Sequence, residues 1–171
     1  CDWLELDFER SDDYSFCDDQ GRISYLKLYD RSSFGVIPPE IGVLSELRAL
    51  VMRQNNIHGT IPSSIGDLSY LNMLLLSGNQ LSGTIPEELS KLKYITWFDL
   101  AVNELTGTVP EAFGQNFPYI MWFSVAQNNI TGAISDDFCS YQELQFLMAD
   151  CDTEVICSCC NYCGDIVDDR I

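Results

Sequence analysis

The sequence is poor in the residue types on which most enzymes and nucleic-acid-binding proteins depend. It has one histidine, His58, and 9 lysine and arginine residues against 26 aspartate and glutamate residues, which gives a net charge of −17. Because phosphate groups repel so acidic a chain, nucleic acids and anionic membrane surfaces are excluded as partners. No convincing Ser-His-Asp or zinc constellation can be built around a single histidine, and no G-x-x-x-x-G-K-[ST] phosphate loop occurs. We therefore expect a protein that is not an enzyme and has no cofactor or metal.

The sequence also lacks a long hydrophobic run and an initiator methionine. A membrane-spanning helix needs about 18 consecutive apolar residues, whereas the longest apolar stretch, residues 119–126, is interrupted by Ser124. The chain begins at Cys1 with no signal peptide before it, so we expect the mature or trimmed product of a secreted or cell-surface protein. The alternative is an ectodomain cut from a membrane receptor, which would need chain beyond Ile171.

Cysteine is absent from the middle of the chain and concentrated at its two ends. The early pair is Cys1 and Cys17, and the late group is Cys139, Cys151, Cys157, Cys159, Cys160 and Cys163. An even number placed in this way predicts disulfide-bonded caps formed in an oxidising compartment, with the pairing of the late six left open. A soft metal ion in the late group is the alternative, disfavoured because no histidine lies nearby. A lipid-modified Cys1 is weaker still, since it would leave Cys17 without its expected partner.

What the chain does contain is a repeat. The segments LRALVMRQNNIHGTIP, LNMLLLSGNQLSGTIP and ITWFDLAVNELTGTVP overlay residue for residue, and IMWFSVAQNNITGAIS follows with one change at its end. Their asparagines, Asn55, Asn79, Asn103 and Asn128, recur at spacings of 24, 24 and 25 residues. A period in the twenties with apolar residues at fixed offsets predicts a leucine-rich repeat solenoid. We expect an α/β-type, right-handed arc of about six coils with a parallel concave sheet and disulfide-stapled caps.

Within each coil the pattern predicts one short strand followed by a sharp turn. The strands are expected near residues 25–28, 49–52, 73–76, 97–100, 122–125 and 146–149. The turn buries backbone polar groups, and an asparagine amide can both donate and accept, so the four asparagines are expected to form a structural ladder. The single insertion, between Pro110 and Ile120, should fall on the convex side and leave the strand register unchanged. The expected divisions are a cap remnant (1–22), repeats (23–138), and the last coil with a cysteine-rich cap (139–171).

The L-x-G-x-I-P signature, read here as IHGTIP, LSGTIP and LTGTVP, resembles the plant-specific class of leucine-rich repeats. That class forms the ectodomains of plant receptor-like kinases and the polygalacturonase-inhibiting proteins. The tail ADCDTEVICSCCNYC instead resembles the cysteine-rich endings of secreted leucine-rich repeat proteins from diatoms and related algae. The resemblance implies extracellular recognition and carries over no residue-level binding site, because members of the class bind different ligands.

The strand register also predicts which side chains face outward on the concave sheet. The first column is Tyr25, Ala49, Met73, Trp97, Trp122 and Phe146, and the second is Lys27, Val51, Leu75, Asp99, Ser124 and Met148. The third is Tyr29, Arg53, Ser77, Ala101, Ala126 and Asp150. Aromatic residues and methionine are enriched in interface cores, so a continuous apolar row on an otherwise acidic protein predicts a binding surface. The alternative is that the row stacks on itself and only stiffens the sheet.

We therefore expect an extracellular module that binds a protein or a polysaccharide on its concave face. The expected binding residues are Tyr25, Lys27, Tyr29, Val51, Arg53, Met73, Leu75, Trp97, Asp99, Trp122, Phe146 and Met148. Among them, Lys27 and Arg53 are candidates to receive a carboxylate or sulfate group, although ordinary surface ion pairs explain them equally well. The alternative belongs to another class of function. In it the protein is a structural subunit of an extracellular assembly, a homo-oligomer or filament joined through the same face.

Three further features carry less weight. The triplet Asn129-Ile130-Thr131 is an N-glycosylation sequon, so we expect a glycan on Asn129. The acidic pairs at 12–13, 18–19 and 136–137 lack the spaced oxygen ligands of a calcium loop, which favours solvated charge over bound Ca²⁺. His58 takes the slot that serine or threonine fills in the other coils, as expected of a variable loop residue.

Overall fold

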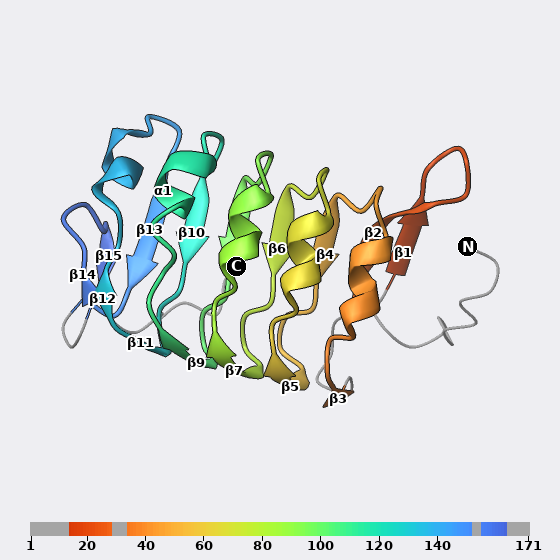
Figure 1. Cartoon of the computed structure of the whole chain (residues 1–171), viewed down its shortest axis with the longest axis horizontal. Helices are drawn as coiled ribbons and strands as arrows, with labels where there is room; N and C mark the ends of the chain where they lie inside the picture. The colour runs from red at the N-terminus through yellow and green to blue at the C-terminus, as the bar shows by residue number, and fades with distance from the viewer. Residues whose placement is uncertain (1–13, 29–33, 152–154, 164–171) are drawn as a thin grey trace.

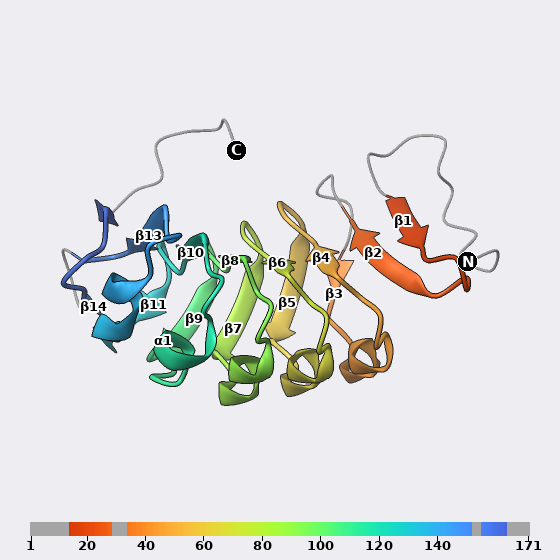
Figure 2. The same ribbon diagram turned by 90° about the horizontal axis from the view of Figure 1, so that it is seen from above.

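The computed structural model describes residues 14–28, 34–151 and 155–163. These residues form one row of stacked coils, with the strands along one face and short helical turns along the opposite face (Figures 1 and 2). The predicted leucine-rich repeat solenoid is confirmed.

Among the described residues, the main sheet has eight strands. In spatial order they are β1 (Tyr14–Cys17), β2 (Ile23–Lys27), β4 (Ala49–Val51), β6 (Met73–Leu75), β8 (Trp97–Asp99), β10 (Trp122–Ser124), β13 (Phe146–Ala149) and β15 (Tyr162–Cys163). β1 is antiparallel to β2, and every other neighbouring pair is parallel. The six expected strands are confirmed to within two residues at each end. β1 and β15 were not predicted, because they belong to the caps and lie outside the repeat.

A second parallel sheet, also not predicted, runs along the lower edge of the solenoid in Figure 1. It contains β3 (Phe34–Gly35), β5 (Asn56–Thr60), β7 (Gln80–Thr84), β9 (Glu104–Gly107) and β11 (Asn129–Ile130). A two-stranded sheet of β12 (Gly132–Ala133) and β14 (Val155–Ile156) lies toward the C-terminal cap. The glycine of each L-x-G-x-I-P motif lets neighbouring coils approach closely. At Gly83, where φ is +78°, an added Cβ would lie only 3.0 Å from Thr60 Cγ2 of the preceding coil.

The convex side consists of short helical turns. In the described part of the chain, four are 3-10 helices, η1 (Pro39–Val43), η2 (Ser63–Asp67), η3 (Glu87–Lys91) and η4 (Asp136–Ser140), and one is the α-helix α1 (Phe113–Asn116). The extra residue of the fourth repeat is accommodated at α1, while Trp122 of β10 still pairs with Trp97 of β8. The expected placement of the insertion is therefore confirmed.

The core is one continuous apolar cluster that extends from Ile37 to Val155. Leucine and isoleucine fill most coils, and five fully buried phenylalanines occupy the C-terminal half: Phe98, Phe113, Phe117, Phe123 and Phe138. The rings of Phe98 and Phe123 are stacked 5.1 Å apart. Each coil thus depends on its neighbours to cover its apolar side chains, as in other solenoids.

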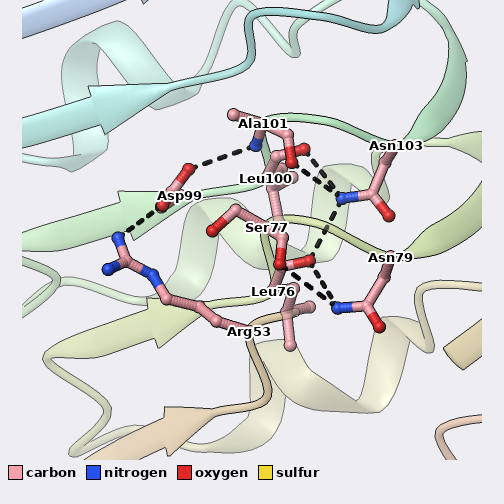
Figure 3. A network of polar contacts seen from close by, with 8 residues as sticks. All are labelled: Arg53, Leu76, Ser77, Asn79, Asp99, Leu100, Ala101 and Asn103. Atoms are coloured by element: carbon pink, nitrogen blue, oxygen red, sulfur yellow. Dashed lines mark hydrogen bonds and ion pairs between the residues drawn. The ribbon is translucent and has the colours of Figure 1, made fainter. Parts of the chain in front are cut away.

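The asparagines make the hydrogen bonds expected of a structural ladder. Asn79 Nδ2 donates to the carbonyl oxygen of Met52 at 2.7 Å and to that of Leu76 at 3.0 Å, while its Oδ1 accepts from the N–H of Ile57 at 3.1 Å. Asn103 repeats this arrangement one coil further on (Figure 3). Each amide thereby ties its own turn to the preceding coil.

The C-terminal cysteines form three disulfides: Cys139–Cys159, Cys151–Cys163 and Cys157–Cys160. The disulfide prediction is confirmed for these six, and the pairing that the sequence left open is defined. Cys17 is also disulfide-bonded, whereas Cys1 lies outside the described residues. Within the described ranges, no helix has the length and apolar character needed to cross a membrane.

Candidate functional site

The concave sheet aligns the first-column side chains into one row. Tyr25 pairs with Ala49, Ala49 with Met73, Met73 with Trp97, Trp97 with Trp122, and Trp122 with Phe146 across successive strands. Because registered residues of parallel strands point to the same face, the large side chains of this row lie side by side. We call Tyr25, Met73, Trp97, Trp122 and Phe146 the aromatic ladder.

The C-terminal half of the ladder is stacked. The rings of Trp97 and Trp122 are 5.4 Å apart and nearly parallel, and those of Trp122 and Phe146 are 4.3 Å apart. Tyr162 of β15 continues the stack at 5.5 Å from Phe146 and is half exposed. Tyr162 was not among the expected binding residues, because it belongs to the cap and follows no repeat register.

Burial on this face differs from the sequence-based expectation. We expected Val51 and Leu75 to face solvent, but they are only 5% and 7% exposed, because Tyr25, Met73 and Trp97 pack around them. Trp122 and Met148 are likewise buried, at 6% and 8% exposure. The ladder therefore does stack on itself, and its accessible parts are the half-buried Tyr25, Met73, Trp97 and Phe146.

An ion pair occupies the middle of the face. Arg53, which follows β4, reaches Asp99 on β8 with 2.5 Å between Nη2 and Oδ2 (Figure 3). Asp99 Oδ1 accepts a hydrogen bond from the N–H of Ala101, so the carboxylate is held from both sides. This pairing compensates the charge of Arg53, which argues against Arg53 as a receiver of a ligand carboxylate. Tyr29, the other third-column candidate at this end, lies outside the described residues.

Three buried polar atoms on this face have no hydrogen-bond partner among the described residues. They are Trp122 Nε1, Ser124 Oγ and Arg53 Nε. All three can donate, and buried donors without acceptors are uncommon in folded proteins.

The groups with perturbed acidity lie away from the concave columns. A hydrogen bond from Arg22 lowers the pKa of Asp18 in the turn between β1 and β2. Burial raises the pKa of Tyr141, whose hydroxyl donates to the carbonyl oxygen of Gly114 at 2.6 Å. The first arrangement closes the turn between β1 and β2 and the second connects neighbouring coils, so both are structural. In the part of the chain that the structure describes, no group of three or more histidine, cysteine or acidic residues is placed to hold a metal ion.

A second aromatic row was missed by the sequence analysis. Tyr70, Tyr94 and Tyr119 are exposed on the segments that lead into β6, β8 and β10, and the rings of Tyr94 and Tyr119 are stacked 6.3 Å apart. The signal was present, since each tyrosine directly precedes the buried Leu or Ile of its repeat. The sequon residue Asn129 is also exposed, on β11.

The chain matches the family model described as leucine rich repeat over residues 45–105. The ectodomain of the receptor kinase SOBIR1 from Arabidopsis thaliana is 31% identical, with a TM-score of 0.71 over 81% of this chain and 78% of that chain. A plant ice-binding protein is 32% identical, with a TM-score of 0.70 over 79% of this chain and 44% of that chain. The plant peptide hormone receptor RGFR1, solved in complex with RGF2, is 30% identical, with a TM-score of 0.66.

The match to RGFR1 covers 73% of this chain and 21% of that chain, so this chain spans only about a fifth of the receptor. No curated protein sequence matches the chain. The repeat motif, the stacked coils and the similarity over most of the SOBIR1 ectodomain agree with one another. The chain therefore belongs to the leucine-rich repeat family and is similar to the ectodomains of plant receptor kinases.

Proposed function

We propose that this protein is a non-catalytic, extracellular recognition module that binds a polypeptide on its concave face. The observation that carries the proposal is the aromatic ladder with its continuation at Tyr162, which together place Trp97, Phe146 and Tyr162 at the accessible surface of one continuous sheet. Trp and Tyr are the residue types most enriched among interface hot spots. The disulfide-bonded C-terminal cap suits an oxidising extracellular compartment.

A polypeptide fits the ladder better than a polysaccharide does. Trp97 and Trp122 lie face to face with 6° between their ring planes, so these faces are already occupied and the ring edges are presented outward. Sugar rings stack on open aromatic faces, whereas polypeptide side chains pack readily against ring edges and the neighbouring methionines. The peptide hormone receptor RGFR1, crystallised with RGF2, supports the same kind of ligand.

The first experiment tests the ladder with Trp97→Ala/Trp122→Ala. We expect this double variant to lose about 30-fold or more in affinity for a protein partner identified in solution, which is the effect of removing about 2 kcal/mol of hot-spot energy. Calorimetry with the purified partner measures it. Tyr94→Ala/Tyr119→Ala is the matched control, because it removes an exposed stacked pair outside the concave columns. Equal affinities for the two double variants would refute the concave site.

The molar mass of the protein in solution distinguishes this proposal from the alternative that the protein is a structural subunit of an extracellular assembly. Sedimentation of the wild type and of Trp97→Ala/Trp122→Ala, with and without Ca²⁺, is expected to show monomers throughout. An oligomer that the double substitution dissociates would instead make the ladder a joint between copies.

A second candidate function rests on serine and threonine side chains in and beside the second sheet. The hydroxyls of Ser82, Thr106 and Thr131 each contact the carbonyl oxygen of a glycine in the preceding coil, at 3.5, 3.3 and 3.4 Å. The Cγ2 atoms of Thr60, Thr84 and Thr108 each lie 3.0 Å from where a Cβ would stand on the glycine of the next coil. Both rows therefore repeat in one orientation at the strand spacing of about 4.8 Å.

Such a regular array of hydroxyl and methyl groups suits a regular solid, and the similar plant ice-binding protein makes ice the candidate. We expect the wild type to slow ice recrystallisation, and Thr84→Lys/Thr108→Lys to lose most of this activity because long charged side chains break the flat array. Microscopy of annealed frozen drops measures it, with Trp97→Ala/Trp122→Ala as the control that keeps the activity. Unrestrained crystal growth in the wild type would exclude this function.

A further inference from the structure

The helical turns of the convex side pack closely where a glycine faces the next coil. A Cβ on Gly42 would lie 2.7 Å from the carbonyl oxygen of Ser64, and one on Gly66 would lie 2.2 Å from that of Glu88. Real Cβ atoms do not approach so closely, so η1–η2 and η2–η3 stack in a way that only glycine permits. The same repeat position in η3 is Ser90.

Since Ser90 carries a Cβ, the next turn cannot approach η3 as η3 approaches η2. That next turn is α1, an α-helical turn, which also holds the inserted residue of the fourth repeat. Ser90 in place of glycine and the inserted residue at α1 therefore both lie at the junction between η3 and α1. An open groove of about 760 Å³ lies at this junction.

The groove is lined by both apolar and acidic residues. Ile85, Pro110 and Ala112 provide apolar surface, while Glu87 comes from η3 and Glu111 from the segment before α1, with Gln115 beside them. Ala112 and Pro110 are half-buried, whereas both glutamates are exposed. The lining thus offers two carboxylates and one amide together with apolar groups that can pack against methylene groups.

No ion pair of Glu87 or Glu111 is found in the described part of the chain. The nearest basic residue of the same turn, Lys91, is directed to the preceding coil, where its Nζ lies 3.3 Å from Asp67 Oδ1. The two carboxylates therefore face the groove without an internal cation, in a protein whose net charge is −17.

We propose that this groove is a docking site for a cationic side chain, arginine or lysine, of a partner polypeptide. The methylene stem packs on Ile85, Pro110 and Ala112, in the way that long basic side chains cover apolar surface while their heads stay polar. The charged head lies between Glu87 and Glu111, where charge-assisted hydrogen bonds form. Charge complementarity selects this occupant, and the site is independent of the concave face.

The test uses a small probe, acetyl-Ala-Arg-Ala-amide, titrated into ¹⁵N-labelled protein at low salt. We expect backbone amide shifts confined to residues 84–87 and 107–115. We expect the apparent Kd to rise at least tenfold for Glu87→Gln/Glu111→Gln. The isosteric change keeps the shape of the groove, and a peptide with citrulline in place of arginine is expected to cause no shifts.

Glu104→Gln/Glu143→Gln is the matched control, because it removes the same charge from exposed glutamates elsewhere. It is expected to bind the arginine peptide as the wild type does, and so is Trp97→Ala/Trp122→Ala, whose concave face is damaged. Shifts spread over the acidic surface, or equal weakening by both glutamine pairs, would overturn the proposal in favour of non-specific attraction.

Discussion

Replacing Asn79 with alanine is expected to lower the free energy of unfolding by about 3 kcal/mol or more. The side chain satisfies three backbone groups, the carbonyl oxygens of Met52 and Leu76 and the N–H of Ile57. Each buried group left without a partner costs about 1–3 kcal/mol. Alanine fits in the space of the asparagine but has no polar side-chain atoms, so all three backbone groups lose their hydrogen-bond partner together.

Urea denaturation followed by circular dichroism measures this effect. Asn79→Asp is an informative companion, because a carboxylate keeps the acceptor for Ile57 but loses both donations and brings negative charge toward two carbonyls. Gln80→Ala is the control, since Gln80 is exposed on the adjacent position. If Asn79→Ala unfolded at the same urea concentration as Gln80→Ala, the hydrogen bonds of the asparagines would not be the main interactions that stabilise the turns.

The second large effect is expected at Phe98, which is completely buried at the centre of the phenylalanine cluster. Its ring contacts those of Phe113, Phe117 and Phe123 at centroid distances of 5.6, 5.8 and 5.1 Å. Truncation to alanine leaves a cavity between coils and is expected to cost about 3–5 kcal/mol. Thermal and urea unfolding both report it.

Tyr94→Ala provides the comparison, since Tyr94 lies near Phe98 in the sequence but is exposed. Its loss is expected to change the free energy of unfolding by less than about 1 kcal/mol. Phe98→Leu retains much of the buried volume and should fall between the two. A cost for Phe98→Ala no larger than that for Tyr94→Ala would mean that the coils close over the lost ring.

The fold was predictable because each coil repeats the same sequence pattern. In a solenoid a residue contacts its own coil and the next one, so a pattern read within about 25 residues already describes most contacts. That is why the six inner strands, the asparagine ladder and the placement of the insertion all follow from aligned segments. The caps do not repeat, and β1 and β15 were accordingly missed.

The candidate site was predictable in position but not in exposure. The columns of the concave face follow from strand register, which alternates between core and surface. The solvent exposure of Val51 and Leu75 depends on how the side chains of the half-buried ladder residues on neighbouring strands pack against them. The pairing of Arg53 with Asp99 likewise joins residues two coils apart and has no signature in the repeat.

The sequence alone thus determined the solenoid, its register and the identity of the residues on each face, because these depend on periodicity. Only the tertiary structure decided which of these side chains remain accessible, how the late cysteines pair, and where the convex turns separate. These outcomes depend on contacts between non-repeating residues of different coils. The groove between η3 and α1 and the extension of the aromatic stack by Tyr162 of the cap are two examples.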